Sequence, residues 1–351
     1  MSSTLIAAPA PSVARREASE HAASAARRLG LSGYIACFSG IVWREILRYL
    51  HQRERFLSAL VRPLIWLFIF AAGFRQTLGV SIIPPYESYV LYEEFITPGL
   101  IAMILLFNAM QSSLSMVYDR ETGAMRTLLV SPFPRSFLLL SKLLGGVSVA
   151  LLQVYAFLFV AWFWEIQPPH VTEIKLFTMY DPPHWLNGPW DIFDGNSGPL
   201  ISPVTDPIVT PLFGLPSFIQ PFAGYITVIP ALVIAGLMLG SLALFMSSVI
   251  KQLENFAGVM NFVIFPMFFA SSALYPLWRI REASPLLYEI CRFNPFTYAV
   301  ELIRFGFHGQ VDVISLLIVV GCTTVFLAAA VYAYNPSKGL IGRRGGPGGG
   351  A

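Results

Sequence analysis

Residues 95–118 read FITPGLIAMILLFNAMQSSLSMVY, a stretch of 24 residues without Asp, Glu, Lys or Arg. A helix of about 20 apolar residues is long enough to cross a lipid bilayer. Four further stretches also lack these four residue types, namely 143–164, 207–250, 255–278 and 313–337. The sequence therefore predicts an all-α integral membrane protein.

The composition of the whole chain agrees with this prediction. Of the 351 residues, 55% are apolar and only 12% are charged, about half the charged share of a soluble domain. A water-soluble enzyme is excluded. The net charge of +3 gives no basic excess that would attract nucleic acid, and the three isolated cysteines form no CxxC pair. We expect no nucleic-acid partner, no metal and no cofactor of the chain's own.

Six membrane spans are expected within a permease domain of residues 34–334. The first span contains Arg62, whose long side chain can reach back to the membrane interface. The stretch 207–250 is expected to hold only one span, because three prolines and Gln220 interrupt its first half. The expected spans are about 57–76, 95–117, 136–164, 225–250, 256–277 and 313–334.

The basic residues predict an orientation with both termini in the cytoplasm. With six spans, 17 of the 23 Lys and Arg residues fall on the cytoplasmic side, as the positive-inside rule requires. Residues 1–33 are expected to be a disordered cytoplasmic tail and residues 335–351 a Gly-rich cytoplasmic tail. The expected location is the cell (inner) membrane, as a multi-pass protein.

From Ile41 the pattern becomes that of an amphipathic helix. Trp43 and Ile46 lie on one side, whereas Arg44 and Arg48 lie on the other. Such a helix is expected to lie flat on the membrane surface. An exposed helix packed on protein would show the same pattern.

The expected spans contain few polar or ionisable groups at mid-membrane depth. In spans two and five the larger polar side chains are Asn108, Gln111 and Asn261. A proton-coupled carrier would need a titrating residue along its path, and these spans supply none. The energy for transport is therefore expected to come from another subunit.

The connector between spans two and three, residues 118–135, reads YDRETGAMRTLLVSPFPR. Asp119 can cap a short helix, in which Met125, Leu128 and Leu129 line one face before two prolines end it. A polar turn that obeys the positive-inside rule would explain the arginines but not the apolar face. The pattern favours a short docking helix on the cytoplasmic surface.

This connector resembles that of the permeases of type 2 ATP-binding-cassette (ABC) exporters, which include drug, lipo-oligosaccharide and polysaccharide export permeases. Their pattern here is an acidic residue, Arg-Glu, Gly, Met-Arg, Leu-Leu, Ser-Pro and Pro-Arg. The resemblance spans roughly residues 43–309, apart from one insertion. Matching stretches in the family's order are RPLIWL (62–67), ITPG (96–99), NFVIFP (261–266), LYPL (274–277) and NPFTYAV (294–300).

The resemblance implies a homodimeric permease that works with a cytosolic ABC ATPase. The nucleotide site is expected on a separate polypeptide, because this chain has no GxxxxGK[ST] motif. The resemblance also implies an elbow helix at 43–56, a coupling helix at 120–129 and a re-entrant outer segment at 271–296. The residues expected to dock on the ATPase are Asp119, Arg120, Glu121, Gly123, Met125, Arg126, Leu128 and Leu129.

Residues 165–222 depart from the family's pattern, which has a shorter connection here. The segment contains eleven prolines, two tryptophans and six acids against one lysine. We expect an ordered external cap of turns and short extended pieces. It could be an exit lid or a dock for a periplasmic partner, or it could only thicken the outer surface.

Together these features predict the membrane-spanning permease subunit of an ATP-driven exporter, which is not itself an enzyme. An amphipathic or lipid-linked substrate is favoured, because the spans offer aromatic walls and few groups that could solvate a charged solute. Ordinary packing would also explain the aromatic residues. A non-transporting membrane scaffold that anchors or regulates an ATPase complex is the alternative function. The candidate pathway residues are Phe107, Asn108, Gln111, Asn261 and Phe265.

Overall fold

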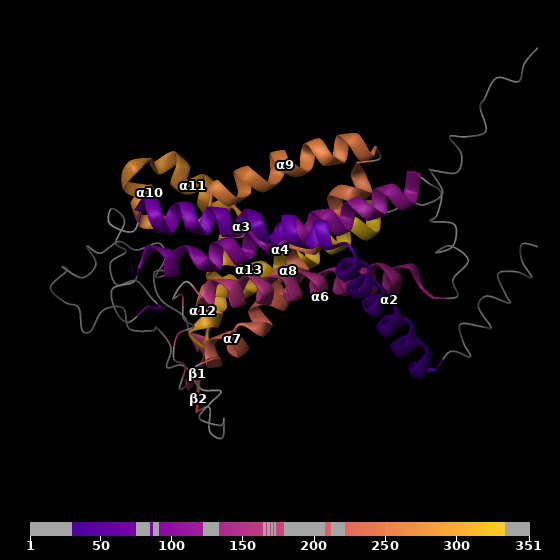
Figure 1. Cartoon of the computed structure of the whole chain (residues 1–351), viewed down its shortest axis with the longest axis horizontal. Helices are drawn as coiled ribbons and strands as arrows, with labels where there is room; N and C mark the ends of the chain where they lie inside the picture. The colour runs from indigo at the N-terminus through magenta and orange to yellow at the C-terminus, as the bar shows by residue number, and fades with distance from the viewer. Residues whose placement is uncertain are drawn as a thin grey trace, which may run out of the picture.

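The computed structural model describes residues 30–74, 85–86, 91–121, 133–163, 166, 169, 171, 173–178, 208–211, 222–250 and 252–333. Within these residues the chain is mainly helical, and six helices run along one axis as a bundle (Figure 1). They are α3 (Arg53–Phe74), α4 (Tyr92–Glu121), α6 (Arg135–Trp162), α8 (Ile229–Val249), α9 (Leu253–Phe269) and α13 (Val313–Ala333).

Helices in four parts of the described chain are long and apolar enough to cross a membrane. These parts are Tyr92–Tyr118, Ser136–Trp162, Ala223–Val249 and Val313–Ala333, and the third combines α8 with the short α7 (Ala223–Thr227). Helices α3 and α9 contain the shorter apolar stretches Ala59–Ile69 and Leu253–Phe269. The helical membrane class is therefore confirmed, whereas membrane crossing by α3 and α9 stays a prediction.

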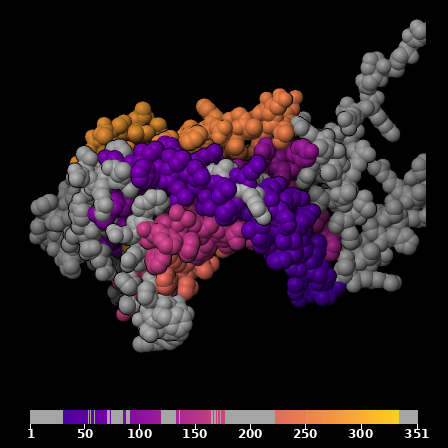
Figure 2. Space-filling view, viewed as in Figure 1, coloured from indigo at the N-terminus to yellow at the C-terminus, as the bar shows by residue number. Residues whose placement is uncertain are grey.

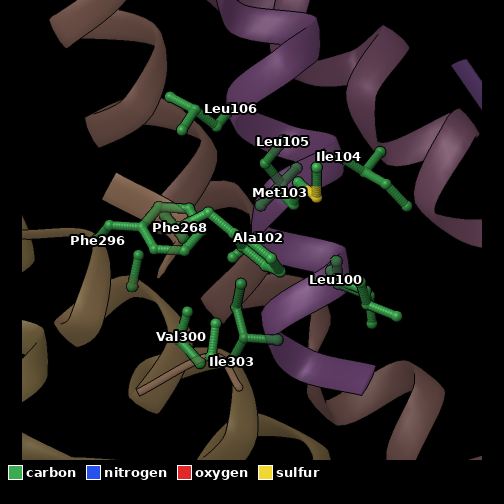
Figure 3. Close-up of a cluster of buried hydrophobic side chains, with 14 of the residues drawn as sticks. Leu100, Ala102, Met103, Ile104, Leu105, Leu106, Phe268, Phe296, Val300 and Ile303 are labelled. Atoms are coloured by element: carbon green, nitrogen blue, oxygen red, sulfur yellow. The ribbon is translucent and has the colours of Figure 1, made fainter. Parts of the chain in front are cut away.

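Helix α4 forms the centre of the bundle. It contacts α3, α6, α8, α9 and α12 (Pro295–Phe307), so side chains on all its sides are buried against protein. Every residue from Leu100 to Leu106 is at most 2% exposed. Figure 3 shows this part of α4 packed against Phe268 of α9 and Phe296 of α12. Because protein covers α4 on all sides, its sequence shows no polar stripe.

The contact between α6 and α8 depends on small residues. Gly236 and Gly240 of α8 face Val147 and Leu143 of α6, and a Cβ atom on Gly236 would lie 3.2 Å from Val147 Cγ1. A GxxxG spacing permits such close helix approach.

The backbone between α9 and α10 (Leu277–Ala283) leaves the helical path but stays inside the protein. Helix α9 ends at Phe269, before the end of the predicted fifth span at residue 277, and residues 271–274 are buried. Carbonyl groups in and before this turn accept side-chain hydrogen bonds. Asn294 Nδ2 donates to the carbonyls of Met267 (2.7 Å) and Ala270 (2.6 Å).

Two further donors reach the same turn from other helices. Tyr92 Oη of α4 donates to the carbonyl of Leu274 (2.9 Å), and Arg304 Nη2 of α12 donates to the carbonyl of Ser272 (3.0 Å). Because buried carbonyls without partners are costly, these bonds allow a non-helical turn between apolar helices.

The segment expected to be re-entrant, residues 271–296, contains this turn, α10 and α11 (Pro285–Phe293) at one end of the bundle (Figure 1). Capping residues separate its helices. Ser284 Oγ accepts a hydrogen bond from Leu287 N, and Asn294 Oδ1 accepts one from Phe296 N at the start of α12. Prolines follow both caps, at the first helical position that favours them.

A small sheet lies at the same end of the molecule. Its order is β2 (Ile208–Pro211), β1 (Glu173–Thr178), β3 (Gln310–Asp312), with β1 antiparallel to β2 and parallel to β3. Strands β1 and β2 fit the short extended pieces expected in the insertion, whereas residues 179–207 of the insertion lie outside the described residues. Strand β3 was not predicted. Gly309, with φ of 65°, leads into it.

Helix α2 (Leu31–His51) lies obliquely at the opposite end of the bundle, where it packs on α6 and α3 (Figures 1 and 2). It begins at Leu31, so residues 31–33 of the predicted tail are helical, and it breaks at Gln52 before α3. Trp43 is 62% exposed. The amphipathic helix is therefore present, and its place on a membrane surface stays a prediction.

We call the two ends of the bundle the α2 end and the sheet end. The described chain starts and ends at the α2 end (Figure 1). The C-terminus of α4 and the N-terminus of α6 also lie there. The connector, which was predicted to be cytoplasmic, therefore joins helices at the same end as the two termini.

Gly99 provides a test of the packing around α4. A Cβ atom on Gly99 would lie 2.6 Å from Ala273 Cβ and 2.7 Å from the carbonyl oxygen of Ala273, so Gly99→Ala forces the backbone of the turn to move. We expect a loss of about 1–3 kcal/mol of unfolding free energy, as overpacking usually costs, measured by denaturant titration in detergent micelles. Gly258→Ala in α9 is the matched control, because no atom lies within 4 Å of its Cβ position. Equal stability of the two variants would contradict this account.

Candidate substrate site

A cavity of about 580 Å³ lies between α2, α4, α6 and α9 near the α2 end. Its lining combines apolar side chains, such as Leu114, Val149 and Met260, with a larger number of polar ones. A cavity of this size and mixed lining fits a small organic ligand or part of a larger one. The polar lining residues are Glu45, Arg48, Tyr49, Gln52, Asn108, Gln111, Ser112, Ser115 and Tyr118.

A buried hydrogen-bonded triad borders the cavity and joins three helices. Tyr49 Oη of α2 donates to Gln153 Oε1 of α6 over 2.8 Å, and Asn108 Nδ2 of α4 donates to the same oxygen. Asn108 Nδ2 also donates to the carbonyl of Ile104 (3.0 Å). The exposed fractions of Tyr49, Gln153 and Asn108 are 4%, 1% and 6%. Since buried polar groups are costly without partners, this triad ties α2 to the bundle.

The charged side chains that line the cavity come from α2. Glu45 pairs with Arg44 (3.0 Å) and with Arg48 (3.6 Å). Its side chain also lies close to α6, because Glu45 Cγ would be 3.3 Å from a Cβ atom at Gly145. Arg48, which lines the cavity, and Arg44, which does not, thus flank the Glu45 carboxylate.

Aromatic side chains lie next to the cavity on the side of the sheet end. The rings of Phe107 and Phe265 meet edge to face with centroids 6.2 Å apart, and the Arg62 guanidinium lies 4.1 Å from the Phe107 ring centroid. Phe107 lies near the middle of α4, and the expectation that Arg62 reaches the membrane interface stays a prediction. A cation–π contact contributes about 0.5–1 kcal/mol at an exposed site and about 2 kcal/mol or more when it is desolvated.

The structure places four of the five candidate pathway residues together. Asn108 and Gln111 line the cavity, and Phe107 and Phe265 contact each other beside it. Asn261 instead lies on an exposed face of α9 and is not among the residues that line the cavity. The role of all five in a pathway stays a prediction.

The expected docking residues lie partly outside the described residues. Asp119, Arg120 and Glu121 form the last turn of α4, whereas Gly123, Met125, Arg126, Leu128 and Leu129 fall within 122–132, which the structure does not describe. The expectation that Asp119 caps a separate helix is wrong, because α4 continues through Glu121. A coupling helix could begin only after that residue.

Sequence reasoning missed a buried charged cluster at the sheet end. Glu301 and Arg304 of α12 form an ion pair with side-chain exposures of 1% and 4%. The Arg304 guanidinium also lies 4.3 Å from the Phe95 ring centroid. Their spacing of three residues on a helix, followed by Asp312 near the next helix, was the signal that the sequence offered.

Other groups complete this cluster. The Asp312 carboxylate accepts hydrogen bonds from Ser315 N (3.1 Å) and Ser315 Oγ (2.5 Å) at the start of α13. Burial raises the pKa of Asp312 above its usual range, against the effect of these bonds. Burial also raises the pKa of the Tyr86 phenol to about 12, although Arg304 acts in the opposite direction.

Among the described residues, no three His, Cys, Asp or Glu side chains come together in an arrangement that could bind a metal ion. The expectation that the chain has no cofactor of its own stays a prediction.

The apolar bundle and its cavity define a multi-pass helical membrane protein. A model of the family described as "ABC-2 type transporter" matches residues 37–180 and 202–308. The chain belongs to this family, whose members are membrane permeases of ABC transporters, and the resemblance inferred from the sequence motifs is confirmed.

Three relatives carry the name "Putative transport permease ycf38". Those from Pyropia yezoensis and Porphyra purpurea are each 26% identical to this chain and match 76% of it and 72% of their own length. The relative from Cyanophora paradoxa is 30% identical over 117 residues, which cover 32% of this chain and 38% of that protein. These names agree with the family assignment.

Gln153 is the residue to change in order to test the triad. In Gln153→Leu, Tyr49 and Asn108 lose their shared acceptor while the side-chain volume is nearly kept. We expect a loss of about 1–3 kcal/mol, the usual cost of leaving a buried donor unsatisfied, together with faster hydrogen exchange in residues 41–51. Hydrogen exchange followed by mass spectrometry measures this. Thr324→Val, an exposed change on α13, is the control. Unchanged exchange in α2 would show that the triad does not dock this helix.

Proposed function

We propose that this chain is the permease subunit of an ATP-driven exporter that moves an amphipathic or lipid-linked substrate out of the cytoplasm. In this proposal a separate cytosolic ABC ATPase binds ATP, the permease works as a homodimer in the cell (inner) membrane, and both termini are cytoplasmic. The observation that carries the proposal is the cavity of about 580 Å³, lined by both apolar and polar groups, in a chain of the ABC-2 type transporter family.

The geometry supports a route for mechanical coupling. Helix α4 runs from the connector end to the turn after α9, and on the way it supplies Asn108, Gln111 and Ser115 to the cavity wall. A movement of the connector would therefore displace the cavity lining directly. Because the triad joins the three helices by hydrogen bonds, α2 would move together with α4 and α6. The substrate and ATP would shift the balance of conformations only through different affinities for each.

In the proposed arrangement the sheet end faces outward. The insertion of residues 165–222 would then be external, where β1 pairs both with β2 and with β3, the strand before α13. This position suits an exit lid or a dock for a periplasmic partner.

The alternative function is a scaffold that anchors or regulates an ATPase complex without moving a substrate. Proteoliposomes that contain the full chain and its ATPase distinguish the two functions. We expect ATP-dependent movement of an amphipathic substrate across the vesicle membrane, with ATP hydrolysis that the substrate stimulates. ATPase binding without any directional transport would favour the scaffold.

Filling the cavity provides a direct test of its role. Ser115→Trp places a large side chain in the cavity lining, so we expect transport in the proteoliposome assay to fall at least tenfold. ATPase co-purification should be unchanged, because Ser115 is not among the residues expected to dock on the ATPase. Val325→Trp is the matched control, since Val325 is 63% exposed on α13. Normal transport by Ser115→Trp would show that the substrate does not pass through this cavity.

The connector makes a second, independent prediction. Arg126→Ala or Glu121→Ala is expected to reduce transport at least tenfold and to weaken either ATPase co-purification or the stimulation of ATP hydrolysis. Arg292→Ala removes an exposed charge at the sheet end and should leave all three quantities unchanged. If the connector variants export normally and retain the ATPase, the connector is not the docking site.

A further inference from the structure

Arg62 is a charged side chain in an apolar part of the bundle. It lies within the apolar stretch Ala59–Ile69 of α3, and its side chain is exposed at the surface of the chain. The exposed residues beside it on α3 are apolar, and include Val61 (48% exposed), Ile65 (50%) and Phe68 (57%). A cation on an otherwise apolar membrane-facing surface usually marks a functional position.

The depth of Arg62 follows from its contact with α4. Its guanidinium lies over the ring of Phe107, and Phe107 is two residues from the middle of the candidate span Tyr92–Tyr118, about 3 Å along the helix axis. The charge is therefore near mid-depth. The residue that follows Phe107, Asn108, lines the cavity wall, whereas Arg62 itself does not.

No carboxylate balances this charge within the described residues. The ion pairs there join Glu45 to arginines of α2, Glu289 to Arg292, and Glu301 to Arg304, and none includes Arg62. Glu45, the carboxylate that lines the cavity, is already paired with Arg44 and Arg48. An anionic ligand at Arg62 therefore meets a guanidinium that has no carboxylate partner among the described residues.

We propose that Arg62 binds the anionic head group of an amphiphile whose apolar part lies against the aromatic side chains of α4 and α9. This inference rests on the proposed export function and defines its substrate class as anionic amphiphiles, with a phosphate or a carboxylate as the recognised group. A guanidinium suits both, because it donates paired hydrogen bonds to their oxygens. Phe107, Phe265 and Phe269 form a contiguous aromatic group, of which Phe107 is buried beneath Arg62 and Phe269 is 45% exposed.

The test measures binding to the full chain in phosphatidylcholine nanodiscs, without any ATPase. The probes are lysophosphatidic acid and lysophosphatidylcholine with the same acyl chain, so they differ only in the choline that neutralises the phosphate. We expect the wild-type chain to bind lysophosphatidic acid at least tenfold more tightly. Equal dissociation constants for the two probes would overturn the proposal without the need for any variant.

Three variants test whether the preference for lysophosphatidic acid depends on Arg62. Arg62→Gln should abolish it, Arg62→Lys should retain most of it, and Arg279→Gln, which removes one positive charge outside the bundle helices, should leave it unchanged. Size-exclusion chromatography checks that each variant is folded and reports its oligomeric state. A preference that persists in Arg62→Gln overturns the proposal. An equal loss of affinity for both probes also overturns it, because that result indicates a packing role for Arg62. A loss of the dimer with unchanged binding overturns it as well, because that result indicates a role in the dimer interface.

Two further measurements distinguish an amphiphile from free phosphate and from bulk membrane lipid as the source of the anionic group. Inorganic phosphate at millimolar concentration should not displace lysophosphatidic acid, and displacement would indicate a site for free anions. Nanodiscs that also contain phosphatidylglycerol should preserve the preference, whereas its loss would assign the site to bulk membrane lipid. Because these assays need no transport, a chain that passes them but moves no substrate would refute the exporter function and leave the binding site standing.

Discussion

The non-helical turn between α9 and α10 imposes the constraint on which the rest of the fold depends. Water cannot satisfy its carbonyl groups, so side chains must do so. Asn294, Tyr92 and Arg304 come from three places in the chain to donate these bonds. Arg304 can be buried there only because Glu301 accompanies it. This requirement explains why α12, which is too short to cross a membrane, is almost wholly buried.

Buried polar groups find their partners through different chemistry at the two ends of the bundle, and α4 connects these ends. At the sheet end a charged pair and a tyrosine secure the N-terminus of α4, whereas at the α2 end a buried triad of two amides and a phenol ties α2 and α6 to α4. Neutral hydrogen bonds cost less to break and remake than a buried ion pair. The end with the cavity is therefore the more adaptable one, as a conformational cycle with a substrate requires.

The sequence predicted features that depend on local composition, and missed those that depend on distant contacts. The stretch without charges at 95–118 identified α4 almost to its ends, and the connector motif identified the family. The burial of Arg304 could not be predicted, because its partners at Ser272 and Phe95 are far away in sequence. Asp119 was expected to cap a short helix, yet α4 continues past it. Nothing in the sequence shows that Phe107 lies beneath Arg62.

Helix α13 is much less buried than α4, the central helix of the bundle. It packs mainly on α8, and only Ser315, Val319 and Ala330 are buried within it. Its exposed side chains, which include Leu317 and Val325, meet only the surroundings of the chain, where any apolar side chain serves about equally well. Over evolutionary time this helix can exchange Leu, Ile, Val and Phe freely on its outer side. Lineages should therefore diverge fastest there, and a comparison of sequences that relied on α13 would underestimate how closely two of these permeases are related.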